Sequence, residues 1–341
     1  MTAPIGVALI GYGLGGRSFH APLIAVTEGL QLRAIATSNA DRRRAATSEY
    51  PGVRIVADAD ALFAHDDDVD LVVISTPNRT HVALAREAIR AGKAVVIDKP
   101  MTPTAREARD LVAEAERAGV MLTTYQNRRW DGDFQTLLRL VRTGRLGDVF
   151  RFESHFERWR PALKGGWRER GDPVEAGGLL YDIGSHLIDQ ALFAFGPVTD
   201  VYAELDRRRP GAEVDDDVFV ALTHAGGVRS HLWASLVVAQ NAPRLRVLGS
   251  KAAYVKWTPD VQEQALRRGE RPVDDTWGAE PEDHWGRVGT NDSWEPVPTD
   301  RGRYQDFYGG VVKAMRDGAP PPVDPRDAIA TLDVIERALR R

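Results

Sequence analysis

Val7-Ala8-Leu9-Ile10-Gly11-Tyr12-Gly13-Leu14-Gly15-Gly16 is the most informative stretch of the sequence. Four apolar residues typical of a buried strand lead directly into Gly11, Gly13 and Gly16, spaced as G-x-G-x-x-G. The first glycine permits a tight turn, the second lets the backbone approach a pyrophosphate, and the third allows close helix–strand packing. Helix-start N–H groups then hold the phosphates. Six candidate nucleotide contacts follow: Gly11, Tyr12, Gly13, Leu14, Gly15 and Gly16.

Short apolar runs alternate with helical patterns through the first third of the chain. The clearest helical patterns are residues 80–91 and 104–118, followed by Gly92 and Gly119, which predict left-handed helix ends. Thr104 begins a capping box. Nearly continuous apolar strands between helices predict a parallel, doubly wound Rossmann sheet in an α/β protein. The predicted strands are residues 7–10, 32–36, 54–57, 71–75, 94–97 and 121–125.

After Tyr125 the pattern changes to consecutive strands, which predict an α+β domain with a mostly antiparallel sheet. Residues 258–301 are rich in Pro, Gly, Asp and Trp and predict a long irregular segment. We therefore expect a dinucleotide-binding domain over residues 1–124 and a substrate-binding and oligomerisation domain over 125–341, whose C-terminal helices pack back on the first domain. The predicted strands are residues 149–156, 198–205, 219–223, 228–236, 245–248 and 253–256; the predicted helices are 134–143, 180–195, 304–317 and 325–340.

Composition excludes several classes of function. A chain of 341 residues exceeds one ordinary hydrophobic core, and 43% hydrophobic with 28% charged residues is typical of a globular protein. A net charge of −4 gives no electrostatic reason to expect nucleic acid. The absence of cysteine excludes disulfides and thiolate catalysis, and the eight histidines show no metal-ligand spacing, so we expect no metal. Without a signal peptide pattern or a long apolar run, we expect a cytoplasmic protein without a membrane partner.

The end of the second predicted strand bears on the choice of cofactor. An NAD-preferring site carries an acid there for the ribose 2′-hydroxyl, whereas this chain has Thr37-Ser38, followed by Arg42 and Arg43. Hydroxyls and guanidinium groups suit a 2′-phosphate, so we expect NADP, with NAD still possible. The alternative is that these arginines belong to an exposed first turn of a helix.

The ends of the fourth and fifth strands add further candidates at the same edge of the sheet. Ser75, Thr76, Pro77 and Asn78 end the fourth strand, where a bound dinucleotide would lie. Asn78 or Thr80 also fits a helix N-cap. His81, in the first turn of the next helix, is either close to the cofactor or simply partly buried. Pro22, early in the segment after the glycine turn, predicts an interrupted first helix.

Three residues suggest the chemistry. Lys99 follows the fifth strand, where its charge could stabilise a developing alkoxide; the alternative is a surface lysine. Asp182 and His186, at i and i+4, would share one face of an α-helix. Hydride transfer from an alcohol needs a base, and histidine titrates in the right range. An isolated Asp–His pair is more often a surface pair, so its weight comes from coexisting with Lys99 and a nucleotide fold.

These motifs together resemble the glucose–fructose oxidoreductase, inositol dehydrogenase and rhizopine-catabolism family (Gfo/Idh/MocA). That family carries E-K-P after the fifth strand and D-x-x-x-H on a helix of its second domain; here Asp98 replaces the glutamate. The likeness covers essentially the whole chain and is strongest to bacterial NADP-dependent scyllo-inositol dehydrogenases. The stretches similar to that subgroup are the glycine turn and residues 19–23, 127–131, 167–168, 181–189 and 274–278.

The resemblance implies roles for individual residues. Lys99, Asp182 and His186 would form the catalytic set, with His186 as general base, Asp182 orienting it and Lys99 binding the reacting hydroxyl. Hydride would pass to the nicotinamide, the bond before the motif proline would often be cis, and homodimers or homotetramers would form through the second-domain sheet. Arg128 and Trp159 could equally be packing or interface residues. Four cleft residues are implied: Gln126, of the cofactor site, and Asn127, Arg128 and Trp159, of the substrate site.

The leading hypothesis is an NADP-dependent oxidoreductase acting on a secondary hydroxyl of an inositol-like polyol or sugar. A close alternative is another substrate of the same chemistry, such as an aldose or a diol. A different class is an NAD-dependent glycosidase that oxidises its substrate transiently. The third is a non-catalytic nucleotide sensor, against which the presence of Lys99, Asp182 and His186 counts. One sequence does not show loop geometry, on which the choice among stereoisomers depends.

Overall fold

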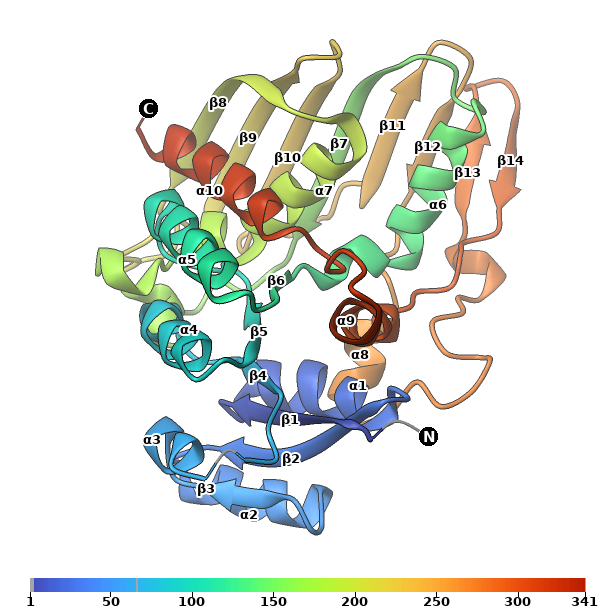
Figure 1. Ribbon diagram of the computed structural model, residues 1–341. Coiled ribbons are helices and arrows are strands. Elements are labelled where there is room, and N and C mark those ends of the chain that lie inside the picture. The colour runs from blue at the N-terminus through green and yellow to red at the C-terminus, as the bar shows by residue number, and fades with distance from the viewer. Residues whose placement is uncertain (1–2, 66, 341) are drawn as a thin grey trace. The chain divides into compact units, whose positions relative to one another are not determined.

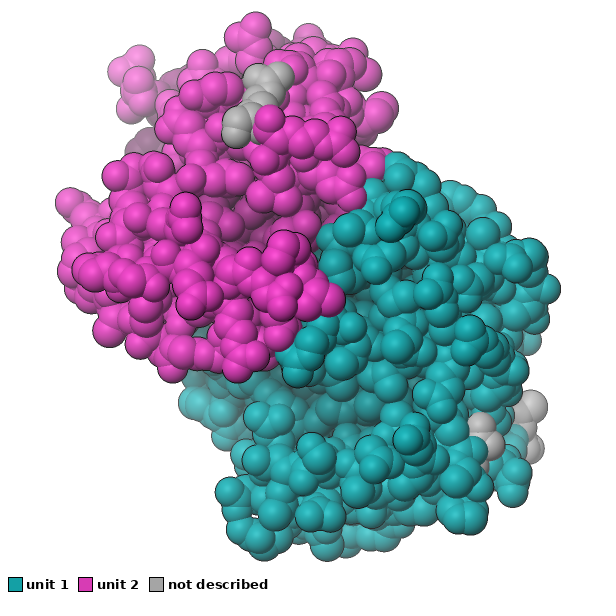
Figure 2. Space-filling model, turned by 90° about the vertical axis from the view of Figure 1, so that its left-hand side faces the viewer, with its two compact units in different colours: residues 1–127, 262–277, 304–329 teal, residues 128–261, 278–303, 330–341 magenta. Residues whose placement is uncertain are grey.

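A computed structural model describes residues 3–65 and 67–340. It divides into two compact units that each combine segments distant in the sequence (Figure 2). Unit 1 comprises residues 1–127, 262–277 and 304–329, and unit 2 comprises residues 128–261, 278–303 and 330–341. Within the described part of the chain, no helix has the length and apolar character needed to cross a lipid bilayer.

Unit 1 contains a parallel sheet of six strands in the order β3-β2-β1-β4-β5-β6 (Figure 1). All six residues of β1 are buried, as expected of a central strand covered on both faces. The order reverses direction beside β1, which is where open parallel sheets bind their ligands. The predicted Rossmann fold is confirmed. The strands are β1 (Ile5–Ile10), β2 (Leu30–Ala36), β3 (Arg54–Val56), β4 (Leu71–Ile74), β5 (Ala94–Asp98) and β6 (Leu122–Tyr125).

The helices of unit 1 begin and end largely where local sequence signals predict. Thr104 caps α5, since its hydroxyl accepts a hydrogen bond from the N–H of Glu107 at 3.2 Å. Gly119 ends the same helix at φ 68°, a conformation that glycine adopts without a steric cost. The helices are α1 (Ala21–Val26), α2 (Ala40–Glu49), α3 (Ala59–Phe63), α4 (His81–Arg90), α5 (Ala105–Ala118), α8 (Gln262–Arg267) and α9 (Gln305–Asp317), with a 3₁₀ turn at Asn78–Thr80.

The helix after the glycine turn is interrupted, as Pro22 predicts. It starts as a π-helix over Gly15–His20 and continues as α1, which carries the proline in its first turn. Proline is tolerated there because the first N–H groups of a helix have no partner within it. His20, the last residue of the π-helix, is fully buried. The wider turn therefore places a histidine inside unit 1.

Unit 2 contains a sheet of eight strands in the order β14-β13-β12-β11-β7-β10-β9-β8 (Figure 1). Among the described strands of this second sheet, only β7 and β10 pair in parallel, so the prediction of a mostly antiparallel sheet is confirmed. The strands are β7 (Val149–Glu157), β8 (Val198–Asp206), β9 (Asp217–His224), β10 (Arg229–Ser235), β11 (Leu245–Gly249), β12 (Ala253–Lys256), β13 (Gly286–Gly289) and β14 (Trp294–Val297).

The prediction that residues 258–301 are irregular throughout is wrong. This segment contains α8 and the strands β13 and β14, which extend the sheet beyond β12. Pro296 is tolerated because β14 is an edge strand. Gly286 lies so close to Tyr254 that a β-carbon there would be 2.4 Å from the ring. Glycine, which locally indicates a loop, here permits close contact with a neighbouring strand, and the proline lies at the edge of the sheet.

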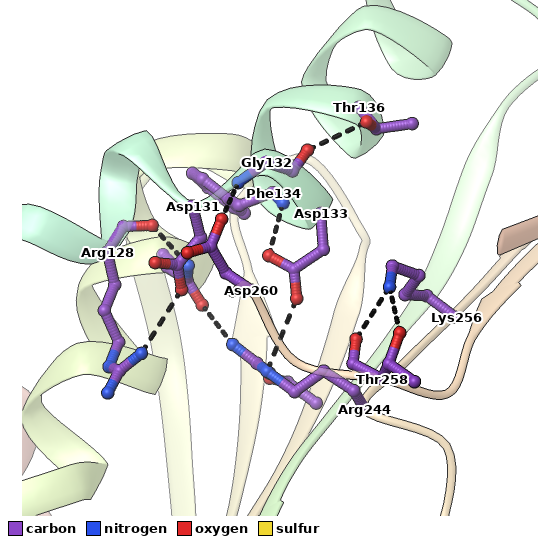
Figure 3. A network of polar contacts seen from close by, with 12 residues as sticks. Arg128, Asp131, Gly132, Asp133, Phe134, Thr136, Arg244, Lys256, Thr258 and Asp260 are labelled. Carbon is purple, nitrogen blue, oxygen red and sulfur yellow. Dashed lines mark hydrogen bonds and ion pairs between the residues drawn. The ribbon is translucent and has the colours of Figure 1, made fainter. Parts of the chain in front are cut away.

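Helices cover one face of this sheet, and a buried polar network fastens one of them (Figures 1 and 3). At the start of α6, the N–H of Gly132 donates to Asp260 at 2.8 Å, and Asp133 pairs with Arg244 at 3.6 Å. Helix α10 begins in unit 1 and ends in unit 2, and the 3₁₀ turn Asn127–Trp130 crosses the same boundary. The remaining elements are α6 (Gly132–Arg142), a π-helix (Leu180–Gly184), α7 (Ser185–Phe195), α10 (Pro325–Leu339) and 3₁₀ turns at Trp167–Glu169, Pro173–Glu175 and Glu282–His284.

Candidate active site

The three motif glycines of unit 1 have different steric surroundings. Gly11 has φ +100°, a backbone conformation that glycine adopts readily and residues with a β-carbon rarely adopt. A β-carbon on Gly16 would lie 1.9 Å from the carbonyl oxygen of Gly11, so the third glycine makes the turn possible. A β-carbon on Gly13 would meet only the guanidinium of Arg42, at 3.6 Å. The second glycine therefore leaves open the space that a close-approaching phosphate needs.

A pocket of ≈ 700 Å³ opens beside this turn within unit 1. The buried Tyr12 forms part of it and donates its hydroxyl to Glu49 at 2.6 Å. Burial raises the pKa of Tyr12 far above its usual value, and the Glu49 carboxylate adds to the effect, so the phenol remains protonated. Glu49 also accepts from Arg17. The polar lining residues include Tyr12, Arg17, Ser18, Asp41, Arg42, Glu49, Tyr50, Arg267, Arg268 and Arg271.

The residues after β2 separate into two groups. Thr37 is buried and its N–H donates to the carbonyl of Val56 at 3.0 Å, whereas Ser38 is exposed. Arg42 lines the pocket, while Arg43 is exposed and lies outside the lining set. Of the four residues expected here to contact a cofactor, the structure thus brings only Arg42 to the pocket.

A compact polar cluster surrounds Asp98 at the end of β5. Ser75 Oγ donates to Asp98 Oδ2 at 3.1 Å, and the buried His20 Nε2 lies 3.6 Å from the same oxygen. Burial would raise the pKa of Asp98, but contact with His20 and the charge of Lys99 outweigh it and lower the pKa to about 2. Asp98 Oδ1 accepts from the N–H of Lys99 at 2.9 Å. The carboxylate that replaces the family's glutamate therefore fixes the backbone of the neighbouring lysine.

His20 links this cluster to a late part of the chain. Its Nδ1 lies 2.7 Å from the hydroxyl of Tyr308, in α9, and its ring packs 4.3 Å from that of Tyr125. Burial raises the pKa of Tyr308 well above the usual value. His20 was not predicted as a site residue from the sequence. Its position in the F-H-A-P-L run of residues 19–23 was the only available signal, because its partners are about 80, 100 and 290 residues away.

His81, which was expected either close to the cofactor or simply partly buried, is fully buried within unit 1. Its Nδ1 lies 3.0 Å from the carbonyl oxygen of Pro100 and its Nε2 3.0 Å from that of Thr76. It thereby joins the end of β4 to the turn after β5, where the Lys99–Pro100 bond is cis. Burial lowers the pKa of His81, against the opposing charge of Asp98. The side chain of Thr80 does not cap α4; its hydroxyl instead donates to the Pro77 carbonyl at 2.8 Å.

The remaining candidates of unit 1 lie at strand ends. Asn78 is buried, and the hydroxyl of Thr76 lies 2.7 Å from that of Thr80. Gln126 follows β6, is buried, and its side-chain oxygen has no hydrogen-bond partner among the described residues. A buried, unsatisfied amide oxygen and the space over Gly13 both fit a bound dinucleotide, which offers amide and phosphate groups.

In unit 2, the predicted helix over residues 180–195 is not a uniform α-helix. Residues 180–184 form a π-helix before α7 begins at Ser185. The α-helical spacing on which the sequence prediction relied is therefore replaced at Asp182 by a π-turn, which closes i→i+5 bonds. His186 is buried, while Asp182 is about one-third exposed and accepts from Arg168 Nε at 3.2 Å. Arg168 belongs to the stretch of resemblance at residues 167–168, for which no role was predicted.

Arg128 and Trp159, the two further substrate-site candidates of unit 2, differ in exposure. Arg128 is buried, stacks 4.6 Å from the Phe156 ring and pairs with Asp131 at 3.4 Å (Figure 3). These contacts are those of a packed residue. Trp159 is 60% exposed, and its backbone forms an isolated antiparallel β-bridge with that of Val237. Trp159 therefore remains open to a ligand or a partner.

Arg129 and Asp189 form a buried ion pair that was not predicted from the sequence. Arg129 binds Asp189 through two hydrogen bonds, at 2.8 and 2.6 Å, and both side chains are almost fully buried. The neighbouring Gln190 donates to the carbonyl of Arg128 at 2.7 Å, and Asn127 is buried beside it in sequence. Asp189 is the one acidic residue of the largely apolar helix α7, which was the available signal. These bonds attach the segment that carries His186 to the chain after β6.

Fold and site define a class: a two-unit protein with a dinucleotide-binding Rossmann sheet and a second, mostly antiparallel sheet. Residues 5–126 match the model described as "Oxidoreductase family, NAD-binding Rossmann fold", and residues 134–255 match the GFO/IDH/MocA C-terminal domain. The chain belongs to the Gfo/Idh/MocA family and is an oxidoreductase. The resemblance noted from the sequence is thereby confirmed.

Individual relatives span nearly the same length. The chain is 40% identical to the uncharacterized oxidoreductase YdgJ of Escherichia coli, covering 98% of this chain and 96% of that protein. It is 35% identical to scyllo-inositol 2-dehydrogenase (NADP(+)) IolW of Bacillus subtilis, over 98% and 93%. The structure of YPO2259 from Yersinia pestis matches with a TM-score of 0.91 at 39% identity, over 100% of this chain and 95% of that one.

Proposed function

We propose that this protein is an NADP-dependent dehydrogenase that transfers hydride between the nicotinamide and a secondary hydroxyl or ketone of an inositol-like polyol or sugar. Unit 1 binds the dinucleotide and unit 2 supplies substrate contacts. The observation that carries the NADP assignment is the basic pocket beside the glycine turn. In this pocket, the guanidinium of Arg42 lies 3.6 Å from where a β-carbon of residue 13 would be. The end of β2, at Thr37 and Ser38, has no carboxylate to select a 2′-hydroxyl.

The chain's own residues divide the work of the reaction. The bound nicotinamide supplies the hydride acceptor. His186 accepts the hydroxyl proton of the substrate, since a neutral imidazole is a competent base near pH 7. Asp182 orients His186, and the Lys99 ammonium stabilises negative charge on the reacting oxygen. Asp98 is a positioning residue, because it receives the Lys99 N–H.

The substrate class rests on chemistry that the family shares. One relative is named scyllo-inositol 2-dehydrogenase, another D-apiose dehydrogenase and a third D-glucoside 3-dehydrogenase. All three names describe dehydrogenases of a sugar, a glycoside or a cyclic polyol. An inositol is our first choice because the relative with that name is 35% identical over almost the whole chain, against 28% for the other two.

We propose a homodimer or homotetramer formed through the sheet of unit 2. Aromatic rings form a row across β7–β10: Phe219 pairs in register with Trp233, and Trp233 with His155. Their rings lie 4.9 and 4.2 Å apart, and Tyr202 beside them is 46% exposed. An apolar row on an incompletely buried strand face suits association with a second copy. Light scattering at several concentrations tests this, and a monomer throughout would contradict it.

The decisive experiment is a panel of inositols, aldoses and diols with NADP⁺ and NAD⁺, read by nicotinamide absorbance. We expect reduction of NADP⁺ with a cyclic polyol and a higher kcat/KM for NADP⁺ than for NAD⁺. A cofactor that stays bound through purification, with glycoside cleavage and no net reduced nicotinamide, would support an NAD-dependent glycosidase instead. Nucleotide binding without any turnover would support a sensor.

A further inference from the structure

A segment from between strands of the second sheet belongs to unit 1. Residues 262–277, here called the arm, follow β12 in sequence but lie in unit 1. Gln262 Oε1 accepts from Trp277 Nε1 at 3.1 Å and from the Tyr304 N–H at 2.8 Å, so one buried side chain ties both ends of the arm. Leu266 is also buried. The arm is thus an attached part of the nucleotide-binding unit.

The arm contributes part of the lining of the pocket beside the glycine turn, through Leu266, Arg267, Arg268, Gly269 and Arg271. Arg271 stacks on an aromatic ring of the pocket, with its guanidinium carbon 5.3 Å from the centre of the Tyr50 ring. Tyr50 is buried, and its ring packs edge-on against that of Tyr12 in the glycine turn. A fixed aromatic face restricts the guanidinium and reduces the ordering that ligand binding requires.

Ion pairs account for most of the charge in the pocket. Arg17 pairs with Glu49, and Arg44 pairs with Asp41. Two of the arm's arginines pair within the arm: Arg267 with Glu263 at 2.8 Å and Arg268 with Glu270 at 2.6 Å.

Two pocket guanidinium groups remain. Within the described part of the chain, Arg42 and Arg271 have no carboxylate within ion-pair distance. The charge of Arg271 does act on Glu49: burial would raise the pKa of that carboxyl, but Arg17, Tyr12 and Arg271 together lower it. Arg271 therefore faces the pocket with its charge still available to an anion.

We infer that Arg271 binds the adenosine 2′-phosphate of NADP together with Arg42, making the arm a determinant of cofactor specificity. This inference rests on the proposed function. A phosphate monoester carries up to two charges and presents oxygens that planar guanidinium groups bind bidentately. Arg42 approaches from α2, directly after β2, and Arg271 from a segment more than two hundred residues later in the chain.

Calorimetry of the full-length protein tests the inference without using activity. NADPH, NADH, 2′,5′-ADP and 5′-AMP are titrated into the wild type and Arg271→Ala, with Arg271→Lys to keep the charge. Arg90→Ala, an exposed arginine of α4 outside the pocket, is the matched control. We expect Arg271→Ala to weaken NADPH and 2′,5′-ADP by roughly ten- to a hundredfold, as for loss of a hydrogen bond to a charged group, and to leave NADH and 5′-AMP nearly unchanged.

The outcomes separate the two proposals. A wild-type protein that binds 2′,5′-ADP no better than 5′-AMP contradicts the NADP assignment itself. A wild type that prefers 2′,5′-ADP, combined with an Arg271→Ala variant that keeps this preference, overturns only the role of Arg271. An equal loss of affinity for NADPH and NADH in Arg271→Ala also overturns this role. Arg271 would then contact a part of the molecule that both cofactors share. Thermal unfolding of each variant checks that the arm stays folded.

Discussion

Gly16 packs directly on Gly11: a β-carbon at residue 16 would lie 1.9 Å from the carbonyl oxygen of residue 11. The same addition at Gly13 would meet nothing closer than a flexible guanidinium, 3.6 Å away. The close contact at Gly16 therefore affects folding, whereas the open space at Gly13 affects ligand binding. Glycines of one motif therefore make different and separable predictions.

Gly16→Ala is expected to destabilise unit 1, because the turn must shift to admit a methyl group. Overpacking of this kind costs about 1–3 kcal/mol. Gly13→Ala is expected to unfold at nearly the wild-type temperature but to lose dinucleotide affinity, since the methyl group occupies the phosphate's approach. Thermal unfolding and calorimetric titration of NADPH measure the two effects. Equal melting temperatures for both variants, or wild-type affinity in Gly13→Ala, would contradict this division.

His186→Ala is expected to lower kcat by roughly a hundred- to ten-thousandfold, as for the loss of a general base, with dinucleotide affinity nearly unchanged. Steady-state kinetics and a separate binding titration provide the two readouts. Trp159→Ala is a useful comparison because this exposed side chain is expected to affect KM for the substrate more than kcat. Turnover that survives in His186→Ala would remove it from the mechanism.

Lys99→Met is expected to reduce turnover while leaving the protein folded and able to bind the dinucleotide. The physical reason is that its ammonium stabilises charge on the reacting oxygen, whereas its backbone N–H is already held by Asp98. Binding titrations and kinetics on the same preparation measure both effects. If the variant lost cofactor affinity but kept full turnover at saturating cofactor, the catalytic role of Lys99 would be wrong.

Ser38→Asp is expected to move cofactor preference toward NAD. Ser38 is exposed at the end of β2, where a carboxylate can accept from a ribose 2′-hydroxyl and repels a 2′-phosphate. The ratio of kcat/KM for NADP⁺ and NAD⁺ is the measurement, and Thr47→Asp, on an exposed part of α2, adds the same charge as a control. An unaltered ratio in Ser38→Asp would contradict the proposed position of the 2′-phosphate.

His81 makes the stability of the protein depend on pH. Because burial holds its pKa below 6.5 in the folded state, the unfolded chain binds a proton more readily. Its contribution to stability is complete above about pH 6.5 and declines as the pH falls through that value. Denaturant unfolding from pH 8 to 5 should give a shallower loss in His81→Gln than in the wild type. His224, whose pKa burial also lowers, makes His224→Gln a comparison within unit 2.

Local signals were sufficient for much of the fold. The apolar run before Gly11 and the alternation after it predicted the Rossmann sheet, because each unit of such a sheet forms from neighbouring residues. Thr104 and Gly119 marked the limits of α5 by capping rules that act within one turn. By contrast, the i, i+4 spacing of Asp182 and His186 assumed an α-helix throughout, and no local signal predicted the π-helix over residues 180–184.

The sequence by itself determined that a nucleotide turn exists and that Lys99, Asp182 and His186 are the candidates for chemistry. Only the tertiary structure decided that Arg42, but not Arg43, lines the pocket, that His20 contacts Asp98, and that the arm brings Arg271 to Tyr50. The physical reason is separation along the chain. Turns and caps depend on contacts within a few residues, whereas the arm's position depends on bonds that Gln262 makes only after distant segments have folded together.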